Sequence, residues 1–321
     1  VRQSADNELP RPTGDGIGKI EYNSNLTHLY AHFVRHTIDT SLEGLTIVYD
    51  GANGAASSVG PEILSGLGAK VININVNPDG LNINHHCGST HIEGLQVAVQ
   101  QHNADLGIAN DGDADRCLLV DEKGQVLDGD QIMLLCALKL KEEGKLKDDT
   151  VVGTVMSNIG FHKAAEELGM KTVSTAVGDR YVLEYMREHD LSVGGEQSGH
   201  VIFLDHNTTG DGMLTAVQVA ALMKEKNKPL SELAGIMTKY PQVLINVRVA
   251  TKTGWEDNDI IKAAIVTAEG ELGDEGRVLV RASGTEPLIR VMAEGPNLEE
   301  LQSLCQEIAD IIGREQGLAE K

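Results

Sequence analysis

Three carboxylates at alternate positions, Asp111, Asp113 and Asp115, are the residues of this sequence best suited to chemistry. Gly and Ala separate them, and the apolar runs 104–109 and 117–120 flank them, which indicates a short buried strand on each side. Alternate residues of an extended chain point the same way, so we expect the three carboxylates to converge. A hard divalent cation would remove their mutual repulsion, and all-oxygen ligation suits Mg²⁺. The spacing therefore predicts a Mg²⁺ site at the tip of a sheet.

Two other structures could account for this acidic stretch. An EF-hand calcium loop has Asp at similar spacing and a Glu at its twelfth position, where Glu122 stands. Its sixth position needs Gly for a sharp turn, but Arg116 stands there and an apolar run follows. These features exclude the EF-hand. A solvated acidic hairpin stays open as the alternative.

A second group of polar residues joins two apolar runs near the end of the chain. Hydroxyl groups, a glycine amide and two guanidinium groups occur within ten positions, and arginine binds phosphate in two-point geometry. This composition favours a phosphate-binding loop over a hairpin with surface arginines. The candidate residues are Arg281, Ser283, Gly284, Thr285 and Arg290.

Two further stretches carry weaker signals. The glycine-rich segment 194–200 contains Glu196, Ser198 and His200, which suit recognition of sugar hydroxyls or an amine, although an ordinary glycine-rich turn competes. Arg180 follows Asp179, which we expect to be the N-cap of a helix. Its guanidinium could face a cleft or lie on the helix surface. The glycine-rich turn at 50–54 opens a helix and could bind an anion, but an ordinary strand-to-helix connection is the better interpretation.

The hydrophobic pattern predicts an α/β fold with two successive three-layer α/β domains and a small α+β C-terminal domain. The expected boundaries are 1–20 for a polar lead-in, 21–122 for the domain with the acidic loop, 123–241 for the domain with segment 194–200, and 242–321 for the last domain. Helices are expected at 22–39, 57–67, 93–102, 130–140, 161–168, 179–189, 212–224, 229–239, 259–272 and 298–312. Strands are expected at 45–49, 69–74, 104–109, 117–120, 150–156, 171–175, 191–194, 243–250, 277–282 and 288–293.

The composition narrows the class of protein. A formal net charge of −21 over 321 residues argues against nucleic acid or an anionic membrane as a partner. The four cysteines lie far apart and form no C-x-x-C pair, so we expect free buried thiols in a reducing compartment. No apolar segment is long enough to span a membrane, and no signal peptide opens the chain. We therefore expect a cytoplasmic protein.

The four stretches 111–116, 178–181, 195–200 and 281–287 with Arg290, in this order, resemble the α-D-phosphohexomutase family. The lead-in at 9–14 adds to the resemblance, which covers nearly the whole chain. It implies interconversion of glucosamine 6-phosphate and glucosamine 1-phosphate through a phosphoserine and a bisphosphorylated sugar. The substrate would be a phosphorylated amino sugar, the cofactor Mg²⁺, and the resemblance allows a homodimer.

The resemblance also implies a role for each candidate residue. The three aspartates 111, 113 and 115 would hold Mg²⁺ beside the phosphoserine. Glu196 and Ser198 would bind sugar hydroxyls, His200 would face the 2-position, and Arg180 would contact substrate. The residues of 281–290 would hold the phosphate that does not react. Ala114 replaces a Gly that is frequent in the family's acidic loop, a change that we expect to leave ligation intact.

One part of the family pattern is missing. The family's catalytic serine lies in an Ala-Ser-His-Asn-Pro loop, which this sequence does not contain. We therefore expect no catalytic nucleophile here, a further α/β domain before Val1, and an inactive chain when it stands alone. Two alternatives remain: a phosphomannomutase or phosphoglucomutase, and a non-catalytic phosphosugar-binding protein.

Overall fold

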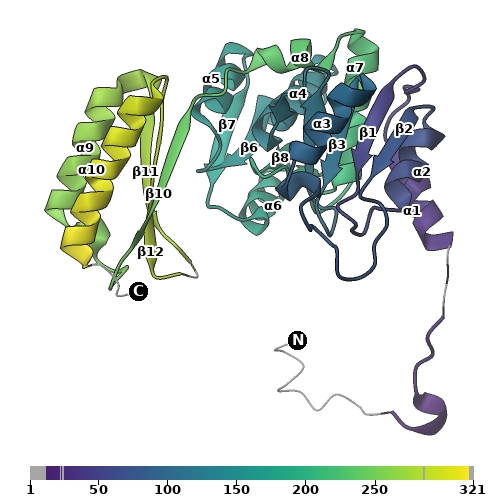
Figure 1. Cartoon of the computed structure of the whole chain (residues 1–321), viewed down its shortest axis with the longest axis horizontal. Helices are drawn as coiled ribbons and strands as arrows, with labels where there is room; N and C mark the ends of the chain where they lie inside the picture. The colour runs from purple at the N-terminus through teal and green to yellow at the C-terminus, as the bar shows by residue number, and fades with distance from the viewer. Residues whose placement is uncertain (1–11, 22, 24, 285, 318–321) are drawn as a thin grey trace.

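The computed structural model describes residues 12–21, 23, 25–284 and 286–317. These residues form three units that follow one another along the chain (Figure 1). Residues 12–21, which precede the first helix, extend away from the body of the molecule. The predicted fold class is confirmed, since two α/β units precede a small α+β unit.

The first domain is a five-stranded sheet with strand order β2-β1-β3-β4-β5. Strand β1 pairs in parallel with β2 and β3, whereas β4 and β5 continue the sheet antiparallel. Every residue of β3 is buried, as the apolar run that precedes Asn110 predicts. The elements of the first domain are α1 Asn25–Arg35, β1 Thr46–Asp50, α2 Val59–Gly66, β2 Lys70–Ile74, α3 Glu93–His102, β3 Leu106–Asn110, β4 Cys117–Asp121 and β5 Val126–Leu127.

The second domain repeats this plan with a four-stranded sheet in the order β7-β6-β8-β9. Helix α7 is buried from Gly212 to Met223, and one hydrophobic cluster runs through both domains. The two domains therefore share a core, and their loops are held in fixed relation. The elements are α4 Gly129–Glu142, β6 Thr150–Thr154, α5 Ile159–Glu167, β7 Lys171–Thr175, α6 Asp179–Glu188, β8 Val193–Gly195, β9 Val201–Phe203, α7 Gly212–Lys226 and α8 Leu230–Leu233.

The third domain is an antiparallel sheet in the order β10-β12-β11, covered on one face by two helices. Its hydrophobic cluster is separate from the shared core of the first two domains. Figure 1 shows the helices on the outside and the strands turned toward the second domain. The elements are β10 Gln242–Arg248, α9 Asp259–Leu272, β11 Arg277–Ala282, β12 Leu288–Glu294 and α10 Leu298–Gln316.

Several predicted elements differ from the structure at their ends. The helix expected at 22–39 covers only Asn25–Arg35. The helix expected at 229–239 is the single turn Leu230–Leu233 followed by a 3₁₀ turn, because its residues after 236 lead into the next domain. Strand β5, which lies beyond the expected boundary at 122, pairs with β4 and extends the first sheet to Leu127.

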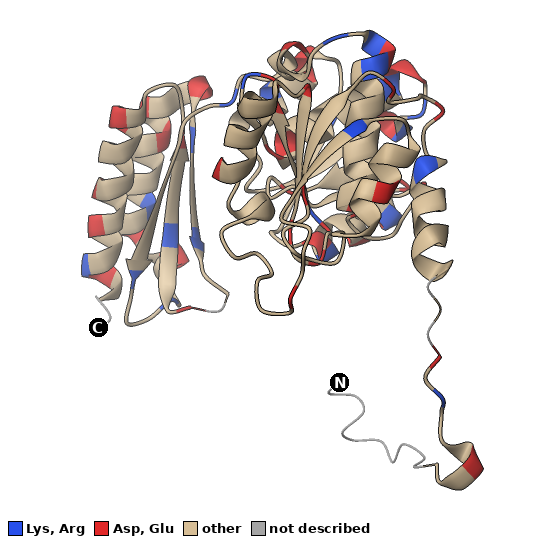
Figure 2. Ribbon diagram, turned by 45° about the vertical axis from the view of Figure 1, so that its right-hand side comes forward, with Lys and Arg blue, Asp and Glu red and all other residues tan. Residues whose placement is uncertain are grey.

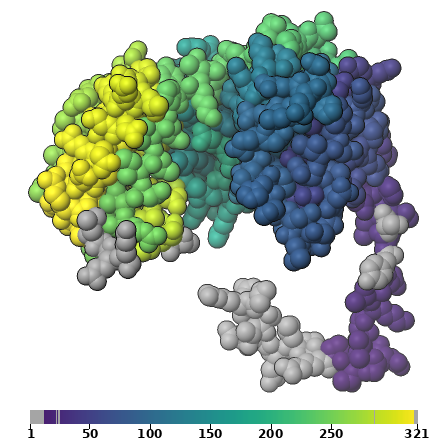
Figure 3. All heavy atoms as spheres, viewed as in Figure 1, coloured from purple at the N-terminus to yellow at the C-terminus, as the bar shows by residue number. Residues whose placement is uncertain are grey.

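The surface shows how charge and shape are distributed. Acidic positions are scattered over the helices of all three units, and basic positions lie along the strands of the C-terminal sheet (Figure 2). The space-filling view is recessed between the C-terminal domain and the first domain, with the second domain set back between them (Figure 3). Among the described residues no helix has both the length and the apolar character needed to cross a bilayer.

Candidate active site

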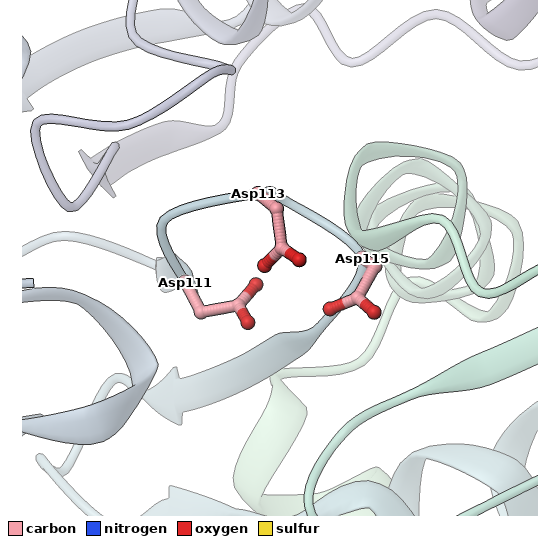
Figure 4. A group of neighbouring side chains, drawn as sticks. All are labelled: Asp111, Asp113 and Asp115. Atoms are coloured by element: carbon pink, nitrogen blue, oxygen red, sulfur yellow. The ribbon is translucent and has the colours of Figure 1, made fainter. Parts of the chain in front are cut away.

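The three aspartates of the acidic loop converge, as the sequence predicts. The loop joins β3 to β4, and one oxygen from each of Asp111, Asp113 and Asp115 lies within 4.8 Å of the others. Figure 4 shows the three carboxylates directed toward a common point inside the loop. In the described part of the chain, no other group of three His, Cys, Asp or Glu side chains is arranged in this way.

The backbone geometry behind this convergence differs from our expectation of an extended chain. The loop is a series of bends, and Ala114 adopts a left-handed conformation with φ of 64°. The curled backbone, not strand alternation, therefore aims the three carboxylates. The left-handed region costs a non-glycine residue roughly 1–2 kcal/mol, so the loop must be held by its surroundings.

Neighbouring segments supply that support. The amide of Ala55 donates to the carbonyl of Gly112 over 2.8 Å, and the amide of Gly212 donates to the carbonyl of Ala114 over 3.0 Å. A Cβ atom at Gly54 would lie 2.3 Å from the carbonyl oxygen of Gly112, so glycine is required there by close approach. The glycine-rich turn at 50–54 thus supports the acidic loop through backbone contact, a role that its sequence did not indicate.

Arg116 forms ion pairs with two of the three carboxylates. The Nε atom of Arg116 stays 3.8 Å from Asp111 and 3.9 Å from Asp115. Burial, together with the negative charge of Asp115, raises the pKa of Asp111 to about 6. Three oxygen donors that repel one another in a partly buried loop are the donor set of a hard cation such as Mg²⁺.

His200 reaches the acidic loop from the second domain. Its Nδ1 atom lies 3.0 Å from Oδ2 of Asp115, and its Nε2 atom accepts a hydrogen bond from the amide of Gly210 over 3.0 Å. Because Nε2 is an acceptor, the proton is on Nδ1 and is donated to Asp115. The imidazole is buried, with 3% of its side chain exposed. Both ring nitrogens are therefore engaged by protein atoms.

The other residues of segment 194–200 lie between β8 and β9. One oxygen of Glu196 accepts a hydrogen bond from the amide of Gly178 over 2.9 Å, and Ser198 is exposed. The amide of Cys117 donates to the carbonyl of Gly199, which ties this loop to the end of the acidic loop. The loop that carries Glu196 and Ser198 is thus tied by its backbone to the strand that follows the acidic loop.

Arg180 is placed differently. Its guanidinium is exposed and pairs with Glu184 one helical turn along α6, at 2.7 Å. Gly178, not Asp179, is the N-cap of this helix. A contact between Arg180 and substrate remains a prediction, and the structure shows only its surface ion pair.

The residues expected to bind phosphate lie on the C-terminal sheet. Arg281 on β11 stands directly opposite Arg290 on β12. Burial and the charge of Arg290 lower the pKa of Arg281, and the Nε atom of Arg290 is buried without a hydrogen-bond partner. Like charges opposite one another destabilise a sheet, and an anion between them would reverse that effect. Thr285 lies outside the described residues.

The remaining loop residues shape the turn between these strands. The hydroxyl of Ser283 is buried and accepts a hydrogen bond from the amide of Glu286 over 3.2 Å. Gly284 is exposed. The ammonium group of Lys252 donates to the carbonyl of Ser283 and adds a third cation, which sequence reasoning missed because it comes from a different segment.

Comparison with known proteins identifies the class to which this fold and site belong. Three family models of phosphoglucomutase/phosphomannomutase match in order: α/β/α domain II at 21–124, α/β/α domain III at 128–240 and the C-terminal domain at 244–311. The chain belongs to the phosphoglucomutase/phosphomannomutase family. The predicted family membership is confirmed.

Its curated relatives make the assignment more particular. The chain is 55% identical over 306 residues to phosphoglucosamine mutase of Desulforamulus reducens, covering 95% of this chain and 69% of that protein. It is 50% identical to phosphoglucosamine mutase of Bacillus subtilis, covering 98% and 70%. The match therefore leaves about three tenths of each relative's length uncovered.

Solved structures agree on the fold. A phosphoglucomutase/phosphomannomutase family protein from Burkholderia thailandensis superimposes with a TM-score of 0.76 at 20% identity, covering 92% of this chain and 66% of that one. Aspergillus fumigatus N-acetylphosphoglucosamine mutase, solved in complex with GlcNAc-6P and magnesium, gives a TM-score of 0.72 at 24% identity, covering 88% and 68%.

Proposed function

We propose that this chain provides the metal, sugar and phosphate sites of a phosphoglucosamine mutase, which interconverts glucosamine 6-phosphate and glucosamine 1-phosphate. The observation that carries the proposal is the contact between the acidic loop and His200. Segments 85 residues apart in the sequence, each matching a motif of the family, meet at 3.0 Å. The relatives at 50–55% identity are phosphoglucosamine mutases.

The acidic loop is suited to hold Mg²⁺. Its three carboxylates would provide the oxygen ligands, and a cation among them would offset the burial and the charge of Asp115 that raise the pKa of Asp111. The ion would neutralise charge that develops on a transferring phosphoryl group. The chain's own residues then orient the ligands: His200 holds Asp115, while the backbone amide of Arg116 donates to Asp111 over 3.2 Å.

The sugar and its second phosphate would be bound by the other two loops. Glu196, whose orientation is fixed by the amide of Gly178, and the exposed hydroxyl of Ser198 suit hydrogen bonds to sugar hydroxyls. Arg281 and Arg290 would bind the phosphate that does not react, because two guanidinium groups on one sheet face can donate to it together. Binding at both ends would keep the reacting end near the metal.

The nucleophile would come from the part of the relatives that this chain does not match. The chain spans 69–70% of their length, and it contains no Ala-Ser-His-Asn-Pro loop. The matched models are domains II, III and IV in order, and in this proposal the nucleophile lies in a domain of the relatives that precedes domain II. In this proposal the chain alone binds substrate without converting it. A homodimer and a cytoplasmic location remain predictions.

Calorimetric titration tests the proposed specificity. Glucosamine 6-phosphate, glucose 6-phosphate and mannose 6-phosphate would each be titrated into the chain with Mg²⁺ present. We expect the amino sugar to bind most tightly, and we expect Arg290→Met to weaken all three by at least about tenfold, because a charge-assisted pair to phosphate is lost. Stronger binding of either neutral sugar would favour a phosphoglucomutase or phosphomannomutase. Absence of binding to all three would refute the proposal.

A further inference from the structure

One face of the C-terminal sheet carries two pairs of charged residues. Arg277 stands opposite Glu294, and Arg281 stands opposite Arg290. The two pairs are four residues apart on each strand, so all four side chains lie on the same face. Helices α9 and α10 pack on the other face, where the cluster of buried apolar residues lies. The face toward the second domain therefore has an acid–base pair at one end and the two arginines farther along.

Glu294 is the centre of a buried polar contact between domains. None of its side chain is exposed. It accepts hydrogen bonds from the amide of Ile159 at 2.9 Å and from the side-chain amide of Asn158 at 3.2 Å, both in the second domain. Arg277 at 2.8 Å and Gln242 at 3.0 Å complete its partners from within the third domain.

Arg277 makes the matching contact from the neighbouring strand. Its guanidinium donates to the carbonyl of Ser157, in the same turn of the second domain. Among the described residues, the side-chain hydrogen bonds between the third domain and the second end on Arg277 or Glu294. A backbone bond from the amide of Gly295 to the carbonyl of Pro241 adds to them at the domain boundary. The hydrophobic clusters of the two domains are separate. A polar contact of this kind fixes position, because each partner left alone would be buried without compensation.

The turn that donates to Glu294, residues 157–159, is also connected to segment 194–200, called the sugar loop below. The amide of Asn158 donates to Oδ2 of Asp130 over 2.8 Å, in the first turn of α4. The preceding residue, Gly129, donates its amide to the carbonyl of Gln197 over 2.9 Å. Turn 157–159 is thus connected both to segment 194–200 and to the sheet that carries the two arginines.

We propose that Glu294 and Arg277 are positioning residues. Their hydrogen bonds to turn 157–159, called the interdomain contact below, hold the C-terminal sheet in place and thereby set the distance of Arg281 and Arg290 from the sugar loop. The interdomain contact itself is independent of the substrate. Its consequence for ligand binding rests on the proposed function of the two arginines.

Reciprocal substitutions test the interdomain contact. Asn158→Asp keeps the oxygen that accepts from the amides of Gly160 and Tyr240. It replaces the amide group that donates to Glu294 and to the carbonyl of Tyr240 with a negative charge. Asp is as good an N-cap as Asn, so helix α5 is preserved. Glu294→Gln removes the carboxylate. The double variant restores an amide–carboxylate pair with its direction reversed. Glu307→Gln, on an exposed face of α10, is the matched control.

Two measurements would be made on each variant of the chain. Spin labels at Glu188→Cys on α6 and Lys262→Cys on α9 report the distance between the domains, since both positions are exposed and the four native cysteines are buried. Calorimetry reports the affinity for glucosamine 6-phosphate. We expect one narrow distance distribution in the parent and control, a broader one in each single variant, and recovery in the double variant. Affinity should fall at least about fivefold in the single variants and recover in the double one.

Each outcome bears on the proposal in a defined way. The interdomain contact would be refuted if the distance distribution stayed unchanged in both single variants. It would also be refuted if the distribution of the double variant were no narrower than that of the worse single variant. A changed distance with unchanged affinity would overturn its role in positioning the arginines. If the parent chain does not bind glucosamine 6-phosphate, the proposed function fails, while the distance measurements still decide whether the interdomain contact exists.

Discussion

The imidazole of His200 donates from Nδ1 to Oδ2 of Asp115 over 3.0 Å, and this contact joins a loop of the second domain to the acidic loop of the first. Since Nε2 accepts from the amide of Gly210, the ring is held in one tautomer. The family resemblance assigns His200 to the sugar, and that role remains a prediction. The geometry adds that the ring contacts a candidate metal ligand, as partners of metal ligands commonly do.

This relationship predicts unequal effects of two substitutions at His200. In His200→Asn the side-chain amide can occupy the position of Nδ1 and still donate to Asp115, whereas His200→Ala removes the donor altogether. We expect the alanine variant to bind Mg²⁺ about 10–100-fold more weakly and the asparagine variant to lose much less. Calorimetric titration of Mg²⁺ into each variant measures the difference. Equal losses in both would show that the hydrogen bond does not orient Asp115.

The metal site itself predicts a sharp loss when one ligand is removed. Asp113→Asn leaves two carboxylates in the loop and should weaken Mg²⁺ binding by at least about 100-fold, a larger effect than that of changing an outer partner. The matched control is Asp274→Asn, which removes an exposed carboxylate from the third domain and should leave the affinity unchanged. An acidic loop that only faces solvent would show no difference between these variants.

The left-handed backbone of Ala114 predicts that glycine stabilises this loop. Ala114→Gly removes the clash of Cβ in a conformation with φ of 64°. We expect the free energy of unfolding to rise by about 1 kcal/mol, with Mg²⁺ affinity retained. Urea denaturation of the parent and the variant measures this change. Destabilisation by glycine would mean that the entropy of the unfolded chain outweighs the strain at this position.

Asp130 predicts a dependence of stability on pH. Burial, together with the charge of Asp128, raises the pKa of Asp130 to about 7 from an unfolded value of 3.8. The folded state therefore binds this proton more tightly, so its contribution to stability is fully present below pH 3.8 and is lost as pH rises to about 7. The carboxylate of Glu294 also raises this pKa, while the amide of Asn158 and the hydroxyl of Ser157 oppose the increase.

The variant Asp130→Asn isolates this contribution. It cannot ionise, yet it retains an oxygen that can accept from the amide of Asn158. Relative to the parent it should gain on the order of 2–4 kcal/mol of unfolding free energy between pH 4 and pH 8. Urea denaturation at several pH values gives this difference, in which the titration of carboxyl groups distant from Asp130 cancels. A difference that does not change with pH would contradict the raised pKa.

The sequence predicts those features that depend on residues close together in the chain, and it does not predict those that depend on contacts between distant segments. Apolar runs such as that of β3 predict strands because burial acts on neighbouring residues, and the three aspartates converge because they are close in the chain. The short strand β5 and the early end of the helix after Pro229 escaped prediction, because tertiary pairing decides them. Contacts between domains, including those of Glu294, leave no local pattern at all.

Formation of glucosamine 1-phosphate is the most direct test of the account. The chain would be fused behind the part of the Desulforamulus reducens relative that it does not match, and supplied with glucosamine 6-phosphate, Mg²⁺ and a trace of glucosamine 1,6-bisphosphate. We expect conversion by the fusion, and none by the chain alone or by the fusion carrying Asp113→Asn. Conversion by the chain alone, or a folded fusion that binds the substrate and never converts it, would contradict the account.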